Sequence, residues 1–143
     1  MADGILYHTM PMTLFENSTF GALIFDLTYM QNSDVVTMNF SYWTQQPVSA
    51  DSVKFISSTS VISGAVKKLY IEPDKKRWKH RYTLSETMGK FSSFFSNKVA
   101  SEAIIYSKGV PYRYQVKKSD WNKYAPIGYK IFEMIQFNET QGR

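Results

Sequence analysis

Seven basic side chains stand within fifteen positions of this chain and form its most conspicuous group of residues able to do chemistry. They are Lys67, Lys68, Lys75, Lys76, Arg77, Lys79 and Arg81. Four ring residues stand among them: Tyr70, Trp78, His80 and Tyr82. Lysine and arginine hold phosphate oxygens, and aromatic rings stack on nucleic-acid bases or on guanidinium groups. The segment therefore predicts a surface that binds an anionic macromolecule.

The pattern of this basic segment predicts a hairpin, with strands over Val66–Glu72 and Trp78–Leu84. Pro73 suits the second position of a type I turn that begins at Glu72 and ends at Lys75. The prediction of a binding surface depends on this hairpin, because only a two-stranded ribbon would present the cations together.

In the expected register Lys68 lies opposite Lys79, and Tyr70 lies opposite Arg77. Like charges opposed across a ladder cost on the order of 0.2 to 1 kcal/mol, which a bound anion would relieve. The predicted anion-binding residues are Lys68, Arg77, Lys79 and Arg81. The predicted stacking or interface residues of this segment are Tyr70 and Trp78.

Two other interpretations of the basic segment stay open. Lysines on a protruding hairpin also protect a sheet edge from pairing with other chains, and in that role they bind no ligand. A surface of this charge can equally face an acidic protein. The charge run alone does not distinguish among a nucleic acid, an acidic protein and a solvated edge.

A second aromatic group follows later in the chain: Tyr106, Tyr112, Tyr114, Trp121, Tyr124 and Tyr129. Basic residues are interleaved with it, at Lys108, Arg113, Lys117, Lys118 and Lys123. Tyrosine beside arginine is typical of protein interfaces and equally of the rim of a β core. Tyr112 and Tyr114 are the predicted interface residues here, and an unpaired sheet edge would favour a homo-oligomer.

The remaining residues offer little catalytic chemistry. Only two histidines occur, His8 and His80, and no carboxylate is obviously shared between them. The chain has no cysteine, which excludes thiolate nucleophiles, redox dithiols, iron–sulfur clusters and cysteine-built zinc sites. Glu72 and Asp74 beside Lys75 form a poor site for a hard cation. We expect no metal and no cofactor, and the sequence predicts no enzyme.

Strand patterns dominate the first half. A hairpin is expected over Phe20–Met30 and Val35–Trp43, followed by a short strand over Val53–Ile56. The second strand of this hairpin has one continuous apolar face that should meet the core: Val36, Met38, Phe40 and Tyr42.

A third hairpin is expected over Glu102–Ser107 and Pro111–Val116, joined through Lys108 and Gly109. Glycine there can take the positive φ that tight hairpins require. This register places Ile105 beside Tyr112. It likewise places Ala103 beside Tyr114.

Helix is expected only in the second half. Ser85 can cap a short helix with an apolar face formed by Met88, Phe91, Phe94 and Phe95. Residues 119–137 are ambiguous, because apolar residues recur at helical intervals while Pro126 and Gly128 favour a break. We favour a helical turn followed by a strand over Tyr129–Phe137.

These elements predict a mainly β (α+β) fold in a single domain spanning residues 1–143. The expected architecture is an antiparallel β-sandwich or a partly open β-barrel with one or two short helices in the second half. The chain has 143 residues, 43% of them hydrophobic and 20% charged, which fits an ordinary globular domain.

Charge and compartment give weaker indications. Residues 1–65 hold one base and five acids, whereas residues 66–143 hold sixteen bases and seven acids. No apolar run is long enough to span a membrane and no export signal is visible, so a soluble, cytoplasmic protein is expected. The alternative of an exported protein whose leader peptide has been removed stays open.

Two hypotheses of function follow. The first is a non-catalytic binding or assembly module that contacts another macromolecule, or itself, through the basic hairpin and the aromatic-rich strands. The alternative is a small enzyme or ligand carrier with a pocket inside the β core. Its polar groups would come from His80, Tyr82 or Tyr114.

Overall fold

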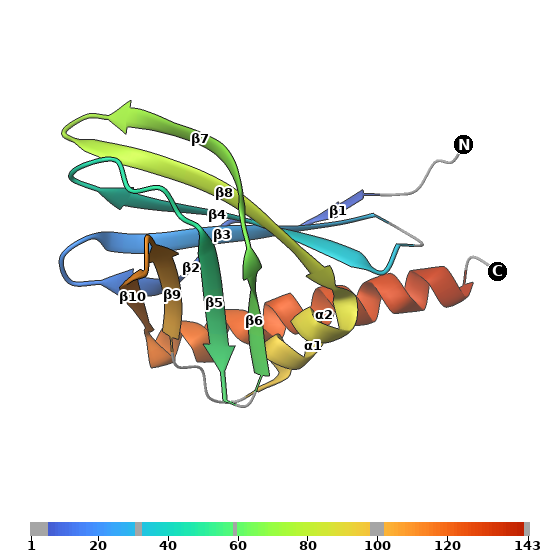
Figure 1. Ribbon diagram of the computed structural model, residues 1–143. Coiled ribbons are helices and arrows are strands. Elements are labelled where there is room, and N and C mark those ends of the chain that lie inside the picture. The colour runs from blue at the N-terminus through green and yellow to red at the C-terminus, as the bar shows by residue number, and fades with distance from the viewer. Residues whose placement is uncertain (1–5, 31–32, 59, 98–101, 142–143) are drawn as a thin grey trace.

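The computed structural model describes residues 6–30, 33–58, 60–97 and 102–141 (Figure 1). The strands are β1 (Leu6–His8), β2 (Met12–Asn17), β3 (Gly21–Met30), β4 (Val35–Thr44), β5 (Ser52–Ser57), β6 (Ser60–Ala65), β7 (Lys67–Asp74), β8 (Arg77–Thr87), β9 (Glu102–Ser107) and β10 (Val110–Val116). The helices of this described part are α1 (Met88–Ser96) and α2 (Lys118–Gln141). The predicted mainly β fold with helices in the second half is confirmed.

The strands form one antiparallel sheet in the order β6-β5-β9-β10-β2-β3-β4-β8-β7, and β1 pairs with the last residues of β3. The two edge strands, β6 and β7, are consecutive in the chain and only Val66 separates them. One stretch of chain therefore pairs with β5 through its first half and with β8 through its second, so the sheet is nearly closed into a barrel (Figure 1). At Gly64, a Cβ atom would lie 3.4 Å from Leu84 Cδ1, so β6 passes close to β8.

Aromatic rings fill the interior. The ring of Phe55 on β5 lies between 5.7 and 6.5 Å, centroid to centroid, from those of Phe15, Phe25, Phe40 and Phe94. The predicted inner face of β4 is confirmed, because its four residues are buried: Val36, Met38, Phe40 and Tyr42. The alternation of side chains along the strand explains both its buried and its outward positions.

Two predicted hairpins are confirmed. β3 pairs with β4, and β9 pairs with β10 in the expected register, with Ile105 opposite Tyr112. The loop between β9 and β10 consists of Lys108 and Gly109, both at positive φ (51° and 80°). Two successive residues at positive φ match the twist of tight hairpins, which is why glycine is suited to the second position.

The first described strands, β1 and β2, were not predicted. Leu14 and Phe15 are both buried although they are neighbours, because the pairing of β2 with β3 shifts register between Thr13 and Phe15. This bulge breaks the alternation of apolar and polar residues from which strands are predicted. For this reason, the alternation of apolar and polar residues does not predict β2.

Helix α1 begins later than expected. Strand β8 continues through Thr87, and the Ser85 hydroxyl pairs with Thr37 Oγ1 across the ladder at 3.1 Å. The cap is Thr87, whose Oγ1 accepts a hydrogen bond from the Lys90 N–H at 3.4 Å. The predicted apolar face is otherwise as expected, since the helix buries three phenylalanines: Phe91, Phe94 and Phe95.

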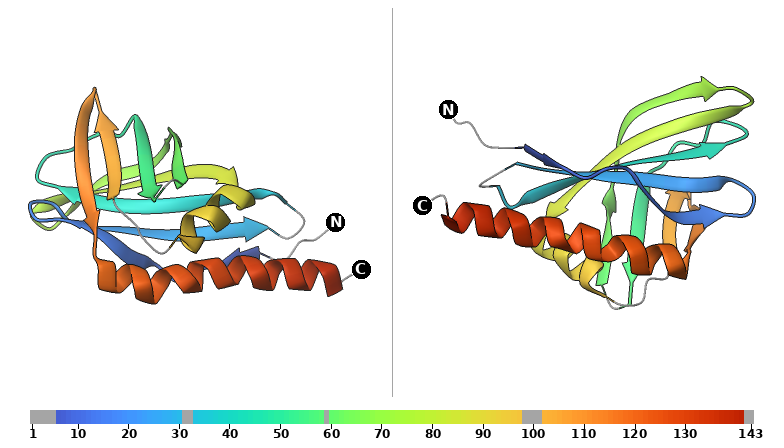
Figure 2. Two further views of the ribbon diagram at one scale, coloured as in Figure 1. Left: turned by 90° about the horizontal axis from the view of Figure 1, so that it is seen from below. Right: turned by 180° about the vertical axis from the view of Figure 1, so that it is seen from behind.

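The predicted strand over Tyr129–Phe137 is wrong, because residues 118–141 form the single helix α2 with Pro126 inside it. Proline removes one main-chain donor from the helix, but packing outweighs this loss. Trp121 meets the rings of Phe94 and Phe95 with centroids 5.4 and 6.1 Å apart, and Phe132 meets Phe95 at 6.5 Å. These buried contacts recur at helical spacing and hold α2 against α1 below the sheet (Figure 2).

Neither helix in the described part of the chain combines the length and the apolar character that crossing a bilayer requires.

Candidate functional site

The basic hairpin exists as β7 and β8, but its turn lies two residues later than predicted. Asp74 pairs with Arg77, so the loop consists of Lys75 and Lys76, with Lys75 at φ +60°. The positive φ of Lys75 gives this loop a twist that suits antiparallel strands better than the type I turn expected from Pro73. Pro73 instead lies within β7, at the edge of the sheet, where strands tolerate a proline.

The true register and a bulge between Lys68 and Tyr70 redistribute the charges. Tyr70 lies opposite Arg81 rather than Arg77, and Lys68 lies opposite the buried Tyr82 rather than Lys79. Lys68 is therefore on the inner side of the ribbon. We use the name arm face for the outer side, which carries Tyr70, Glu72, Asp74, Arg77, Lys79 and Arg81. It brings together three of the four predicted anion-binding residues.

Rings and cations alternate on the arm face. The Lys79 ammonium lies 5.8 Å from the ring centroid of Trp43 and 5.9 Å from that of Tyr70, and the Arg77 guanidinium lies 5.5 Å from that of Trp43. Trp43 Nε1 donates a hydrogen bond to Asp74 Oδ2 at 2.8 Å. Trp43 comes from β4, and sequence reasoning missed it because strand pairing alone brings it beside the arm.

Arg81 is already engaged within the protein. Its Nη2 donates to Asp26 Oδ2 at 3.0 Å, and its Nη1 donates to Ser41 Oγ at 3.0 Å. Asp26 also accepts a hydrogen bond from Asn39 Nδ2 at 3.1 Å. Carboxylates at Asp26, Glu72 and Asp74 thus stand beside the cations, so the arm face is close to electrical balance.

The other predicted stacking residues do not join Tyr70. Trp78 lies on the inner side of β8, opposite Thr44. Tyr112 is half-buried on β10 against Phe20, with ring centroids 5.6 Å apart, and Tyr114 is fully buried. The aromatic residues proposed from the sequence are therefore spread over two regions of the sheet.

β7 also carries several features of a protected sheet edge. Lys67 and Lys68 open the strand, a bulge follows them, and Pro73 stands near the end. Charged residues, bulges and prolines each hinder a second sheet from pairing with an open edge. Part of the basic cluster thus has an explanation that involves no ligand.

His80 lies fully buried on the inner side of β8. Its Nδ1 donates to the Tyr42 carbonyl at 3.2 Å, its Nε2 accepts from the Val48 N–H at 2.9 Å, and its ring stacks on Tyr42 at 4.4 Å. Burial lowers the pKa of His80 below its ordinary value, in agreement with a neutral ring in this pattern. The histidine anchors the segment after β4.

Two tyrosines extend this polar cluster. The Tyr42 hydroxyl donates to the Val48 carbonyl at 2.6 Å, and the Tyr82 hydroxyl accepts from the Ala50 N–H at 2.9 Å. Burial raises the pKa of Tyr114, whose hydroxyl has no hydrogen-bond partner in the described part of the chain. His80 and Tyr82, two residues proposed for an internal pocket, thus bind the 48–50 segment.

A groove runs between α2 and the segment that links β1 to β2. We name it the α2 groove; it has a volume of about 420 Å³ and is lined by His8, Thr9, Met10, Pro11, Met12, Tyr124, Ile127, Lys130, Ile131 and Met134. Met10, Ile127 and Met134 are 82%, 53% and 51% exposed. The helical spacing of Tyr124, Ile127 and Met134 was the available signal, but it could not reveal the facing segment.

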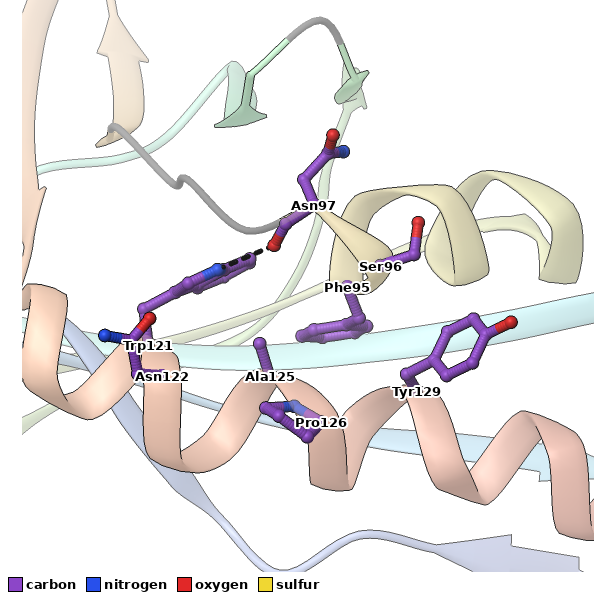
Figure 3. A pocket seen from close by; sticks show the side chains of 8 residues that line it. All are labelled: Phe95, Ser96, Asn97, Trp121, Asn122, Ala125, Pro126 and Tyr129. Atoms are coloured by element: carbon purple, nitrogen blue, oxygen red, sulfur yellow. Dashed lines mark hydrogen bonds between the residues drawn. The ribbon is translucent and has the colours of Figure 1, made fainter.

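A second hollow, of about 520 Å³, lies between the end of α1 and the first half of α2 (Figure 3). Its walls include the rings of Phe95 and Trp121, and Trp121 Nε1 donates to the Asn97 carbonyl at 2.9 Å. This hydrogen bond and the ring contact between Phe95 and Trp121 hold the two helices together (Figure 3). The hollow thus follows from the packing of α1 on α2.

Among the described residues, no group of three or more histidines and carboxylates is placed to hold a metal ion. Compared with family models, with curated proteins and with solved structures, the chain shows no significant match to any of them. The function is therefore argued from the geometry of these surfaces alone.

Proposed function

We propose that this protein is a non-catalytic binding module, and that it docks a segment of another protein in the α2 groove. The observation that carries the proposal is the exposure of Met10, Ile127 and Met134 around one concave site. Large apolar side chains gathered in a hollow mark interaction sites, whereas singly exposed ones are ordinary. Methionine is well suited to such a site because its flexible thioether adapts to varied partners.

The polar groups of the groove favour binding over catalysis. Among the described residues, the basic ones that line it are His8 and Lys130, and none of its described lining residues is a carboxylate. His8 Nδ1 shares a hydrogen bond with Thr28 Oγ1 at 3.1 Å. A general acid–base pair needs two groups within reach of one reacting atom, and the lining does not supply such a pair.

A random dodecapeptide library displayed on phage tests this proposal. The full chain is the target, and an Ile127→Ser, Met134→Ser variant is the counter-target. We expect enriched peptides that bind the wild-type chain at micromolar concentration and the variant roughly tenfold more weakly, because two apolar contacts are lost. Their amide chemical-shift changes should fall on residues 8–12 and 124–134.

The matched control is Leu69→Ser, Val110→Ser, which removes two comparably exposed apolar side chains elsewhere. This control should bind the peptides as the wild-type chain does. Urea midpoints of all variants should agree, because the altered residues are exposed. Peptides that bind both variants equally, or that map to another surface, would contradict the proposal.

A second candidate function concerns the arm face, which would contact a single-stranded nucleic acid. The observation in its favour is the alternation of Trp43, Lys79 and Tyr70, since rings and cations together form stacking platforms for bases. Fluorescence anisotropy with a labelled oligothymidylate tests it over a range of salt concentrations. Lys79→Ala should lower the salt slope by about 1, whereas Lys108→Ala should not. Binding without salt dependence, or no binding, removes this candidate.

A further inference from the structure

The partner of the α2 groove can be described more closely, and this inference rests on the proposed function. We propose that the groove takes an extended segment that carries carboxylates beside apolar side chains, and that this segment adds as a strand to the edge formed by His8–Met10. The charge of the groove and the main chain at its edge both favour such a partner.

The groove is basic on its helical side. Lys130 lines it, and Lys123 lies two turns earlier with its ammonium 5.1 Å from the ring centroid of Tyr124, itself a lining residue. The nearest carboxylates of α2, Asp120 and Glu133, are not among the lining residues. A partner with carboxylates beside its apolar residues would therefore complement both the lysines and the apolar floor.

One wall of the groove is formed by the last residue of β1, His8, and the extended chain that leads from it to β2. The Thr9 N–H donates to the Leu27 carbonyl at 3.0 Å, and Thr9 Oγ1 accepts from the Leu27 N–H at 2.9 Å, so Thr9 faces β3. In an antiparallel pair, main-chain groups alternate between the partner and the opposite side, which turns those of His8, the last residue of β1, away from β3. In the described part of the chain, the main chain of Met10 makes no hydrogen bond.

This wall favours an extended partner over a helical one. A helical partner in the groove would exclude water from the Met10 amide. Because the main-chain groups of a helix hydrogen-bond to one another, such a partner would leave the Met10 amide unpaired. A buried amide left without a hydrogen-bond partner weakens binding. An added strand supplies the missing donor and acceptor, and its alternate side chains reach the apolar floor.

Charge also argues against a second copy of this chain. Two identical α2 grooves facing each other would bring Lys130 and Lys123 of one copy near the same lysines of the other. Like charges at an interface oppose association and favour a partner of opposite sign. The acidic partner is therefore a different protein.

Two designed phage libraries test the inference, with the full chain as the target. In the strand library, apolar positions alternate with positions drawn from Glu, Lys and Ser; in the helix library, the same residues follow a helical period. We expect the strand library to be enriched, with Glu favoured over Lys. The Lys130→Glu variant should bind the selected peptides about two- to fivefold more weakly, since one exposed ion pair contributes roughly 0.2 to 1 kcal/mol. Lys76→Glu, a charge reversal at the far hairpin tip, is the matched control.

Main-chain pairing has its own readout in hydrogen exchange. The Met10 amide should exchange more slowly in the presence of a selected peptide, and N-methylation of alternate peptide amides should abolish binding in one register only. Enrichment of the helix library, or of peptides without a preference for Glu, would overturn the inference of an extended acidic partner. The proposed function, which is binding of a protein segment in the α2 groove, would still stand. Absence of any binder that distinguishes the Ile127→Ser, Met134→Ser variant overturns both. A dimer in sedimentation that this variant dissociates would identify a second copy as the occupant.

Discussion

The arm face and the α2 groove differ in how far their side chains are satisfied within the protein. On the arm face, Arg81 pairs with Asp26, Trp43 donates to Asp74, and Lys79 lies between two rings. In the groove, Met10 and Ile127 remain exposed at more than half of their surface. The charged region is conspicuous in the sequence and largely self-contained, whereas the inconspicuous apolar region still has surface to bury.

The number of charges on a surface therefore does not measure how many of its side chains lack a partner within the protein. A cation beside its own carboxylate contributes to the fold, and a ligand would have to compete with that internal partner. Exposed apolar area has no internal competitor. The variants described next test this difference between the two surfaces, starting with the one expected to change the free energy of unfolding most.

The two faces of α2 should differ most. Trp121→Ala removes a buried ring packed against Phe94 and Phe95 and should lower the free energy of unfolding by about 3 to 5 kcal/mol. Ile127→Ala lies on the groove side and should change it by less than about 0.5 kcal/mol. Urea denaturation measures both. A large loss at Ile127 would mean that the groove side is part of the core.

His80, on the inner side of β8, should make the stability of the protein depend on pH. The pKa of His80 is lowered in the folded protein, so the unfolded chain binds more protons once the pH falls below about 6.5. The free energy of unfolding should decrease from there toward the folded pKa and level off below it, with a slope of at most about 1.4 kcal/mol per pH unit. Urea titrations between pH 7.5 and 5 would measure this slope, roughly spanning the window that the ordinary histidine pKa sets.

The control for this pH dependence is His80→Phe, which keeps a ring on Tyr42 and removes the titrating group. The variant should be less stable at neutral pH and should lack the slope. Glu86, whose pKa is lowered chiefly by the Thr87 N–H, loses its contribution only as the pH falls below the ordinary glutamate range. An unchanged slope in the variant would exclude His80 as its source.

Arg81 and Asp26 should show coupling when they are altered together. A double-mutant cycle of Arg81→Ala and Asp26→Ala should give a coupling energy of about 1 kcal/mol, because the pair is only partly exposed to solvent. Lys68→Ala, on the other side of the ribbon, is the matched control and should change stability little. Zero coupling would leave Arg81 available to a ligand and would strengthen the candidate nucleic-acid surface.

The smallest effect is expected at Lys79. A cycle of Lys79→Gln and Trp43→Leu should give a coupling of about 0.5 kcal/mol, as for other exposed cation–ring contacts. Chemical denaturation of the four proteins at low and high salt would measure it. A coupling that vanishes at every salt concentration would show that Lys79 does not hold the ring.

Regular alternation made much of the fold predictable. The inner face of β4 and the register of β9 with β10 follow from the alternation of apolar and polar residues along a strand. Lys108 and Gly109 are typical turn residues and identify the loop between β9 and β10. The predictions are wrong where contacts with a distant part of the chain override the structure that the local residues favour. Pro126 and Gly128 indicated a break, but the ring packing of Trp121 on α1 keeps the helix continuous, and no reading of residues 119–137 alone contains α1.

The candidate sites were less predictable for the same reason. Arg81 lies 55 residues from Asp26, and the bulge before Tyr70 moves Lys68 to the other side of the ribbon. The α2 groove joins residues near position 10 with residues near position 130, and each half alone is an ordinary apolar segment. A sequence pattern predicts one face of a single helix or strand, whereas each of these surfaces is formed by two elements that are distant in the chain.

The passage of the chain from one margin of the barrel to the other at Val66 has a mechanical consequence. Because β6 and β7 follow each other and pair with β5 and β8 and not with one another, we expect a change in the width of the barrel to require rotation of the main chain near this residue. The remaining seams, each held by paired strands, would keep their bonds during such a change. The continuous chain at Val66 thus closes the barrel by a covalent connection where the other strands close it by hydrogen bonds.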